Sequence, residues 1–212
     1  LRDAINQANA DTGSDLIVFD RSKFASAQTI TLSLGELDIT HNLSIIAPRD
    51  PLTGADLVTV SGNKASRVFE IEPGATVTLS GLIEADGQLP FDAPTLNNPQ
   101  VADNGSGIKN SGILTLDSSI VRNNSISNLF FSPDTGGGIY NTGTLEVNNS
   151  TISGNSAAEG GGIYNQGTLT VNNSTLSSNS ASLRFTAGGG GIYNTGTALI
   201  FNSTLNSNKV SA

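Results

Sequence analysis

Short stretches of alternating apolar and polar residues run along most of the chain, and this period-two pattern predicts β-strands with one buried face. Residues 145–147 (Leu-Glu-Val) and 169–171 (Leu-Thr-Val) show it most clearly. Earlier segments, among them TITLSL and ATVTLSGL, show it between Gly, Pro, Asn and Asp residues. Residues 1–12 instead place three apolar side chains on one helical face, those of Leu1, Ile5 and Ala8. The pattern therefore predicts an all-β chain that begins with one short helix.

The second half of the chain is a repeat. Segments 136–157, 160–181 and 189–208 each begin with GGGIYN and continue through GT to NST, and a weaker copy occupies 105–125. The isoleucines of this repeat recur at intervals of 31, 24 and 29 residues, and they are Ile108, Ile139, Ile163 and Ile192. A period of about 20 to 30 residues with short strands is typical of a solenoid.

Each repeat contributes only a few apolar side chains, too few to offset the conformational entropy that its ordering costs. Parallel coils stacked about 4.8 Å apart would merge these side chains into one continuous core. We therefore predict a right-handed, single-stranded parallel β-helix. It spans residues 1–212 as one domain, with a capping helix at 1–12, irregular coils at 13–104 and regular repeats at 105–212. Three further core columns are expected: Leu114, Leu145, Leu169 and Ala198; Leu116, Val147, Val171 and Ile200; and Val121, Ile152, Leu176 and Leu205.

Asparagine occupies two fixed positions of the repeat, both of which the strand alternation directs inward at a turn. A buried amide is costly unless it is hydrogen-bonded, and identical amides stacked at strand spacing can bond one another. We therefore interpret these residues as structural ladders rather than as ligands of a bound group. One ladder comprises Asn110, Asn141, Asn165 and Asn194, and the other comprises Asn124, Asn155, Asn179 and Asn208.

The composition limits the partners that the chain can have. It contains neither Cys nor Met, and its net charge of −8 with a pI of about 4.4 disfavours a nucleic-acid partner. The lack of an initiator Met indicates a piece of a longer protein. No apolar run approaches the length of about 18 residues that a membrane span requires. The low content of Lys and Glu favours an extracellular β-protein.

Two motifs carry a family resemblance. The opening LRDAINQANADTGSDLIVFD resembles the start of bacterial secreted proteins with a CSLREAI-type motif, without its Cys-Ser. The GGGIYNxGTLxVNNSTISGNSA units resemble the repeats of polymorphic outer membrane proteins. This resemblance implies a right-handed parallel β-helix within a large exported or surface-anchored bacterial protein with an adhesive or structural role. The chain departs from the pattern at Lys109, where other repeats have Tyr, and at 198–201 (Ala-Leu-Ile-Phe).

Aromatic residues supply the candidate binding sites. All three tyrosines, Tyr140, Tyr164 and Tyr193, occupy one outward position of the repeat. A row of aromatic rings can bind sugars or a protein surface, or the rings can simply stack on each other. Three insertions at 85–106, 125–136 and 180–190 precede the GIxN strand and should project from one corner of successive coils. They carry Phe91, Phe130, Phe131 and Phe185, which either bind a partner or fold back onto the solenoid.

A catalytic site is not expected. The charged residues of the regular repeats are scattered, namely Asp117, Arg122, Glu146 and Glu159, and His41 is the only histidine. An enzyme of this fold would be a polysaccharide lyase or hydrolase, which requires clustered carboxylates, often with calcium, beside a basic residue. Asp11 and Asp15 could hold a calcium ion, although an Asx turn after the first helix is the favoured interpretation. No cofactor is predicted.

These observations predict an extracellular or cell-surface segment with a structural or adhesive role. Its expected partners are other copies of itself, surface proteins or glycans. The end of the chain at Ala212 falls inside a repeat, so end-to-end association into fibres is part of the hypothesis. A polysaccharide-binding or polysaccharide-degrading β-helix protein is the alternative.

Overall fold

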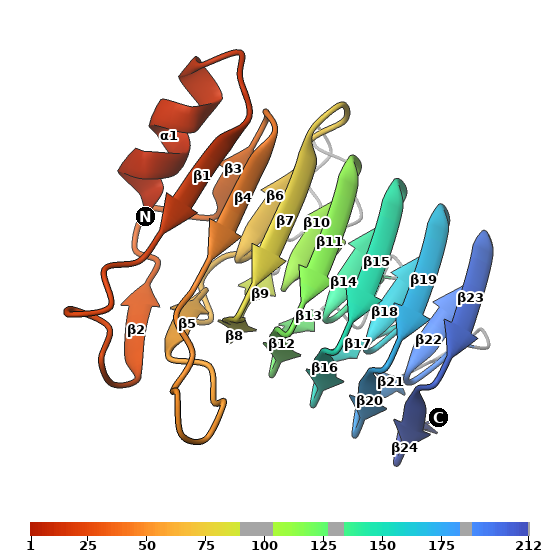
Figure 1. The fold of residues 1–212 in the computed structure, drawn as a ribbon. Coiled ribbons are helices and arrows are strands. Elements are labelled where there is room, and N and C mark those ends of the chain that lie inside the picture. Colours follow the sequence, from red (N-terminus) through yellow and green to blue (C-terminus); the bar gives the residue numbers. More distant parts are fainter. Residues whose placement is uncertain (90–103, 127–133, 183–187, 212) are drawn as a thin grey trace.

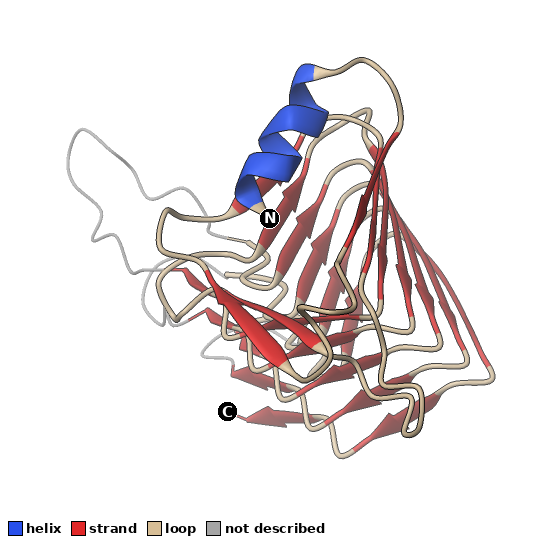
Figure 2. Ribbon diagram, turned by 60° about the vertical axis from the view of Figure 1, so that its left-hand side comes forward, coloured by secondary structure: helices blue, strands red, loops and turns tan. Residues whose placement is uncertain are grey.

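The chain forms a parallel β-helix, as the sequence predicts. The computed structural model describes residues 1–89, 104–126, 134–182 and 188–211, which form one helix, α1 (Arg2–Ala10), and strands β1 to β25 in four parallel sheets. The strands of each sheet lie side by side in the order of successive coils (Figure 1). Seen from the side of the first coil, the sheets surround a common interior (Figure 2).

The four sheets are numbered here in the order in which the chain passes through them. Sheet 1 contains β1 (Asp15–Val18), β4 (Leu43–Ile46), β7 (Thr76–Ser80), β11 (Ile113–Asp117), β15 (Thr144–Asn148), β19 (Thr168–Asn172) and β23 (Thr197–Phe201). Sheet 2 contains β2 (Gln28–Thr31), β5 (Val58–Ser61), β8 (Leu82–Ala85), β12 (Ile120–Arg122), β16 (Thr151–Ser153), β20 (Thr175–Ser177) and β24 (Thr204–Asn206). Sheet 3 contains β9 (Gln88–Leu89), β13 (Ser125–Ile126), β17 (Ser156–Ala157), β21 (Ser180–Ser182) and β25 (Lys209–Ser211). Sheet 4 contains β3 (Leu37–Ile39), β6 (Phe69–Ile71), β10 (Ile108–Asn110), β14 (Ile139–Asn141), β18 (Ile163–Asn165) and β22 (Ile192–Asn194).

We number the coils from the strand of sheet 1 that opens each of them. Coils 1 to 7 span residues 15–39, 43–71, 76–110, 113–141, 144–165, 168–194 and 197–211. The repeat alignment gives the correct strand register, because Ile139 lies opposite both Ile108 and Ile163, and Ile163 lies opposite Ile192. The same column continues into the irregular coils through Phe69.

The three other predicted columns are also paired in register and buried from coil 4 to coil 6. One of them contains an exception in coil 3, since Glu84 lies opposite both Val60 and Val121. A carboxylate therefore occupies a core position whose neighbours in the column are apolar.

The close stacking of the coils also explains the glycine of the GT turn. A Cβ on Gly167 would lie 2.0 Å from the carbonyl oxygen of Gly143, so only glycine fits there without a shift of the backbone.

Helix α1 covers the interior of the first coil and is shorter than the predicted 1–12. Ile5 and Ala8 are buried in the core. The side chain of Asn9 lies against the edge of β3, the terminal strand of sheet 4. The Asn9 amide donates to the carbonyl of Asp38 over 2.8 Å and accepts the backbone N–H of Thr40 over 3.0 Å. The helix thus shields apolar side chains and pairs part of a sheet edge.

The last coil has no comparable cover among the described residues. Three side chains that continue the core columns are partly exposed there: Ile200 at 40%, Leu205 at 49% and Val210 at 53%. The strands β22 to β25 each end a sheet. The two ends of the solenoid therefore differ in what they present to a partner.

Candidate functional site

The inward asparagines of sheet 4 form a continuous hydrogen-bonded ladder. Each Nδ2 donates to the Oδ1 of the asparagine one coil further on, over 2.7 Å from Asn110 to Asn141 and 2.6 Å at the next two steps, to Asn165 and then Asn194. Each Nδ2 also donates to the carbonyl of the threonine three residues after that next asparagine. The first three amides are fully buried, and these contacts satisfy them.

The second asparagine ladder follows sheet 2 and has the same direction. Asn155 accepts the backbone N–H and the Nδ2 of Asn124, each over 3.0 Å, and donates to Asn179 and to the carbonyl of Val121, each over 3.0 Å. Asn179 is joined to Asn208 in the same way. Buried amides thus tie each coil to the coils on both sides.

Serines form a third ladder, which the sequence analysis did not predict. The backbone N–H of Ser119 donates to Oγ of Ser150 over 3.0 Å, and the step recurs from Ser150 to Ser174 and from Ser174 to Ser203 over 3.1 Å. The first three serines are buried. The signal was present, because the NST of each regular repeat places a serine at this turn.

The three tyrosines stack in one column on the outer side of sheet 4. The ring centroids are 5.5 Å apart between Tyr140 and Tyr164 and 5.1 Å apart between Tyr164 and Tyr193. Tyr140 donates from Oη to Gln166 over 3.0 Å, and burial raises its pKa, with a further contribution from Tyr164. Tyr164 is only 8% exposed, so the faces of its ring contact the neighbouring rings and are not open for stacking on a sugar.

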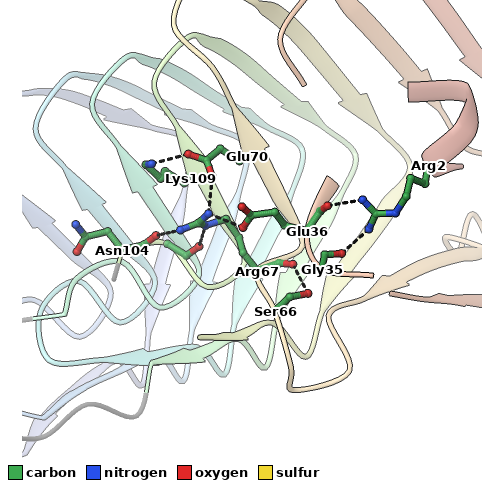
Figure 3. A network of polar contacts seen from close by, with 9 residues as sticks. Arg2, Gly35, Glu36, Ser66, Arg67, Glu70, Asn104 and Lys109 are labelled. Atoms are coloured by element: carbon green, nitrogen blue, oxygen red, sulfur yellow. Dashed lines mark hydrogen bonds and ion pairs between the residues drawn. The ribbon is translucent and has the colours of Figure 1, made fainter. Parts of the chain in front are cut away.

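The same column continues into charged residues toward the first coil. Lys109 lies opposite Tyr140 and Glu70, and Glu70 lies opposite Asp38. Figure 3 shows Arg67 among these residues, with its guanidinium between Glu36 and Glu70. Arg67 is buried, and its Nη1 lies 2.5 Å from Glu36 and 2.6 Å from Glu70. Lys109 pairs with the other oxygen of Glu70.

The Arg67 network joins three successive coils. Beyond its two carboxylates, Arg67 donates from Nε to the carbonyl of Gly105 over 2.9 Å and from Nη2 to that of Asn104 over 3.1 Å. Burial raises the pKa of Glu70, but the hydrogen bond from Lys109 and the charges of Arg67 and Lys109 outweigh it and lower the pKa overall. Burial raises the pKa of Glu36 despite Arg67. The arrangement satisfies a buried cation and is structural in character.

We predict that Arg67→Lys lowers the free energy of unfolding by about 1–2 kcal/mol, because one ammonium cannot reproduce the four contacts of the planar guanidinium. Urea denaturation of the two proteins measures the difference. Arg122→Lys, at an exposed position of β12, is the matched control. Equal stability of Arg67→Lys and the wild type would show that the network contributes little.

Glu84 is the most unusual ionisable group that the structure describes. Its side chain is fully buried in sheet 2, and neither carboxylate oxygen has a hydrogen-bond partner beyond its own backbone. Burial raises its pKa well above the ordinary value, and the negative charge of Asp56 adds to this shift. Asp56 forms an ion pair with Arg49 over 2.8 Å. Glu84 has no access to a substrate, so its altered pKa does not indicate catalysis.

The three insertions leave and re-enter the solenoid at one corner. The chain passes from β9 to β10, from β13 to β14 and from β21 to β22, which in each case is a passage from sheet 3 to sheet 4. Coil 5 makes the same passage with the short segment 158–162. The candidate aromatic residues of the insertions lie outside the described residues: Phe91, Phe130, Phe131 and Phe185.

The candidate catalytic and metal-binding residues do not come together. The Oδ1 of Asp11 accepts the backbone N–H groups of Thr12 and Gly13 over 2.7 and 3.3 Å, which is the predicted Asx turn. Asp117 accepts from Asn149 over 3.0 Å, and His41 contacts Thr40. Within the described ranges no group of three or more His, Cys, Asp or Glu side chains is arranged to hold a metal ion.

In the part of the chain that the structure describes, no helix has both the length and the apolar character needed to cross a bilayer.

Comparison with known proteins relates part of the chain to a repeat family. Residues 149–166 match the model of the Chlamydia polymorphic membrane protein repeat. The matched stretch runs from Asn149 through β16, β17 and β18 and includes Asn155, Tyr164 and Asn165. It supports the resemblance to polymorphic outer membrane proteins and indicates a protein of the cell surface or outer membrane. Neither a curated protein nor a solved structure matches the chain significantly.

Proposed function

We propose that this chain is a non-catalytic, structural or adhesive β-helix segment of an exported bacterial protein, and that the insertions at one corner of the solenoid make its contacts. The observation that carries the proposal is the common passage of the insertions from sheet 3 to sheet 4. Ladders of buried amides hold the coils in fixed register, so segments attached at this corner are spaced by a rigid support. Loops on rigid supports commonly carry recognition.

The partner that we propose is a glycan or a protein on another cell surface. The tyrosine column contributes through ring edges and hydroxyl groups, because the ring faces of Tyr164 are already occupied. The insertions supply four phenylalanines, whose rings suit either kind of partner. The expected extracellular location is part of this proposal.

The test replaces the three long connections with the short one of coil 5. In the variant, segments 90–107, 127–138 and 182–191 each become AEGGG, the sequence of 158–162. We expect the variant to keep the circular dichroism spectrum of the wild type and to lose binding, by at least about tenfold, to immobilised glycans or to fixed epithelial cells. The loss follows because the contact surface is removed while the coils remain.

A second variant separates side-chain recognition from loop length. It keeps every insertion and changes Phe91, Phe130, Phe131 and Phe185 to Ser. Loss of binding in both variants assigns recognition to the aromatic residues. Unchanged binding by the shortened variant would contradict the proposal. It would indicate that the outer surfaces of the sheets, and not the insertions, contact the partner.

The alternative of a polysaccharide-degrading enzyme has a separate test. Incubation with acidic and neutral polysaccharides should release neither unsaturated nor reducing ends if the segment is not catalytic. Release of such ends, abolished by boiling, would overturn the proposal. Self-association into fibres is not part of the proposal, since α1 covers one of the two ends that a fibre requires.

A further inference from the structure

Three copies of the repeat carry the acceptor motif of N-linked glycans at one corner of the solenoid. The motif is Asn-x-Ser/Thr, and it occurs with threonine at Asn149-Ser150-Thr151, Asn173-Ser174-Thr175 and Asn202-Ser203-Thr204. Each triplet spans the turn from sheet 1 into sheet 2. Because the motif recurs with the repeat, its presence alone does not distinguish an acceptor from an ordinary turn.

The backbone of this turn does not require the motif. The three asparagines have positive φ angles of 52°, 50° and 51°, which asparagine tolerates well. Ser118 occupies the same turn of coil 4 with a φ of 52°. The strand register places Ile120 of coil 4 opposite Thr151, so the threonine is also replaced there. The turn therefore forms without either of the two residues that the motif needs.

The structure exposes the two ends of each triplet and buries its middle. The asparagines are exposed at the turn, whereas Ser150 and Ser174 are buried in the serine ladder. The threonines begin strands β16, β20 and β24 and face outward, since the next residue of each strand belongs to an inward core column. The acceptor amide and the threonine hydroxyl therefore share the outer surface of the solenoid.

Asn173 is the best placed of the three acceptors. Coils 5 and 7 flank it, so its exposure does not come from an end of the solenoid. Within the described ranges its side chain makes no hydrogen bond, and its Nδ2 is accessible. Asn149 is also exposed, but its Nδ2 donates to Asp117 over 3.0 Å.

The motif also occurs with serine in its third position, and there the structure uses or covers the amide. The Oδ1 atoms of Asn42 and Asn104 each accept a backbone N–H of the next coil. Asn148 and Asn172 are half-buried on the outer side of sheet 1. The Oδ1 of Asn123 lies against the turn of the next coil. The threonine triplets are therefore the more accessible set.

We propose that Asn173, and with it Asn149 and Asn202, is a glycosylation site of the exported protein. The Nδ2 attacks C1 of a sugar activated as a diphosphate, and an N-glycosidic bond forms. The bond between C1 and the phosphate oxygen breaks, the diphosphate leaves with the electron pair, and the amide proton passes to a base of the glycosyltransferase. The exporting cell supplies both this enzyme and the sugar diphosphate.

This corner lies opposite the passage from sheet 3 to sheet 4 in the ring of four sheets. A glycan on Asn173 therefore does not cover the corner that the proposed function uses. The inference depends on the exported location that we propose, but it does not depend on a binding role of the insertions.

The test is mass spectrometry of the full chain isolated from the cells that export it. Cleavage after Glu146 and Glu159 places Asn149 and Asn173 on different peptides. We expect the mass of a sugar on both peptides, mapped to these two asparagines. A single hexose would identify a nucleotide-sugar donor, and a larger uniform glycan would identify a lipid-linked donor; either result supports the proposal.

Two variants of Thr175 separate modification from folding. Thr175→Val removes the motif with little change of shape, and Thr175→Ser keeps the motif. We expect the valine variant to lose the sugar on Asn173 completely while its circular dichroism spectrum stays unchanged, and the serine variant to retain the sugar. An unmodified Asn173 in the wild type, or a sugar on Asn173 that survives Thr175→Val, would overturn the proposal. Loss of cell binding in the loop variants does not bear on this result.

Discussion

Asn155→Ala is expected to lower the free energy of unfolding by about 4 kcal/mol. The side chain accepts two hydrogen bonds from Asn124 and donates to Val121 and Asn179, all over 3.0 Å and all away from solvent. Alanine removes every one of these contacts and leaves the buried backbone N–H of Asn124 and the carbonyl of Val121 without the partner that Asn155 supplies, at about 1–3 kcal/mol for each such group. Urea denaturation should show a lower midpoint with an unchanged m value.

Asn148→Ala is the matched control for this change. Asn148 lies on the outer side of β15 in the same coil, and its side chain makes no hydrogen bond within the described ranges. We expect a change of no more than about 0.5 kcal/mol, as for other surface substitutions. If both variants lose equal stability, the ladder is not what holds the coils together.

Raising the pH is expected to destabilise the wild type relative to Glu84→Gln. The native pKa of Glu84 is raised well above the ordinary value of 4.5, chiefly by burial and also by Asp56. Below about pH 4.5 the group is protonated in both the folded and the unfolded chain, so no stability is lost. Above that value the unfolded chain releases the proton first, and stability falls as pH rises through the native pKa.

The size of the effect follows from linkage. Each pH unit between the unfolded and the native pKa costs at most about 1.36 kcal/mol, so the wild type should lose stability relative to Glu84→Gln as the pH is raised from 5. Denaturation curves of both proteins at several pH values measure the difference. Glu146→Gln, at an exposed site on β15, controls for loss of a charge alone.

The substitution Glu84→Val tests whether an apolar side chain at this position is more stable than the buried carboxyl group. Valine is the residue of the column on both sides, at Val60 and Val121. Because it replaces an unpaired buried carboxylate by a matching apolar group, it should raise Tm at neutral pH. Parallel pH profiles of the wild type and Glu84→Gln would refute the interpretation of Glu84 as a buried, protonated acid.

The sequence was sufficient for the architecture because the repeat specifies its own contacts. Once Ile108, Ile139, Ile163 and Ile192 are aligned, stacking identical coils leaves one register that keeps the apolar side chains inside, and the structure has that register. The same alignment placed both asparagine positions inward. In a solenoid, neighbours in space are equivalent positions of successive repeats, so local pattern and tertiary contact carry the same information.

Only the tertiary structure revealed the features that arise where successive coils differ in sequence. Nothing in the period-two pattern distinguishes Glu84 as an inward residue without a partner, because coil 3 lies in the irregular part of the chain. The Arg67 network likewise joins residues from three coils that share no motif. The occupation of the tyrosine faces also required the structure, since sequence gives the position of a ring but not what contacts it. Repetition lets a sequence determine which positions meet, whereas burial and charge at a particular site depend on the particular side chains that surround it.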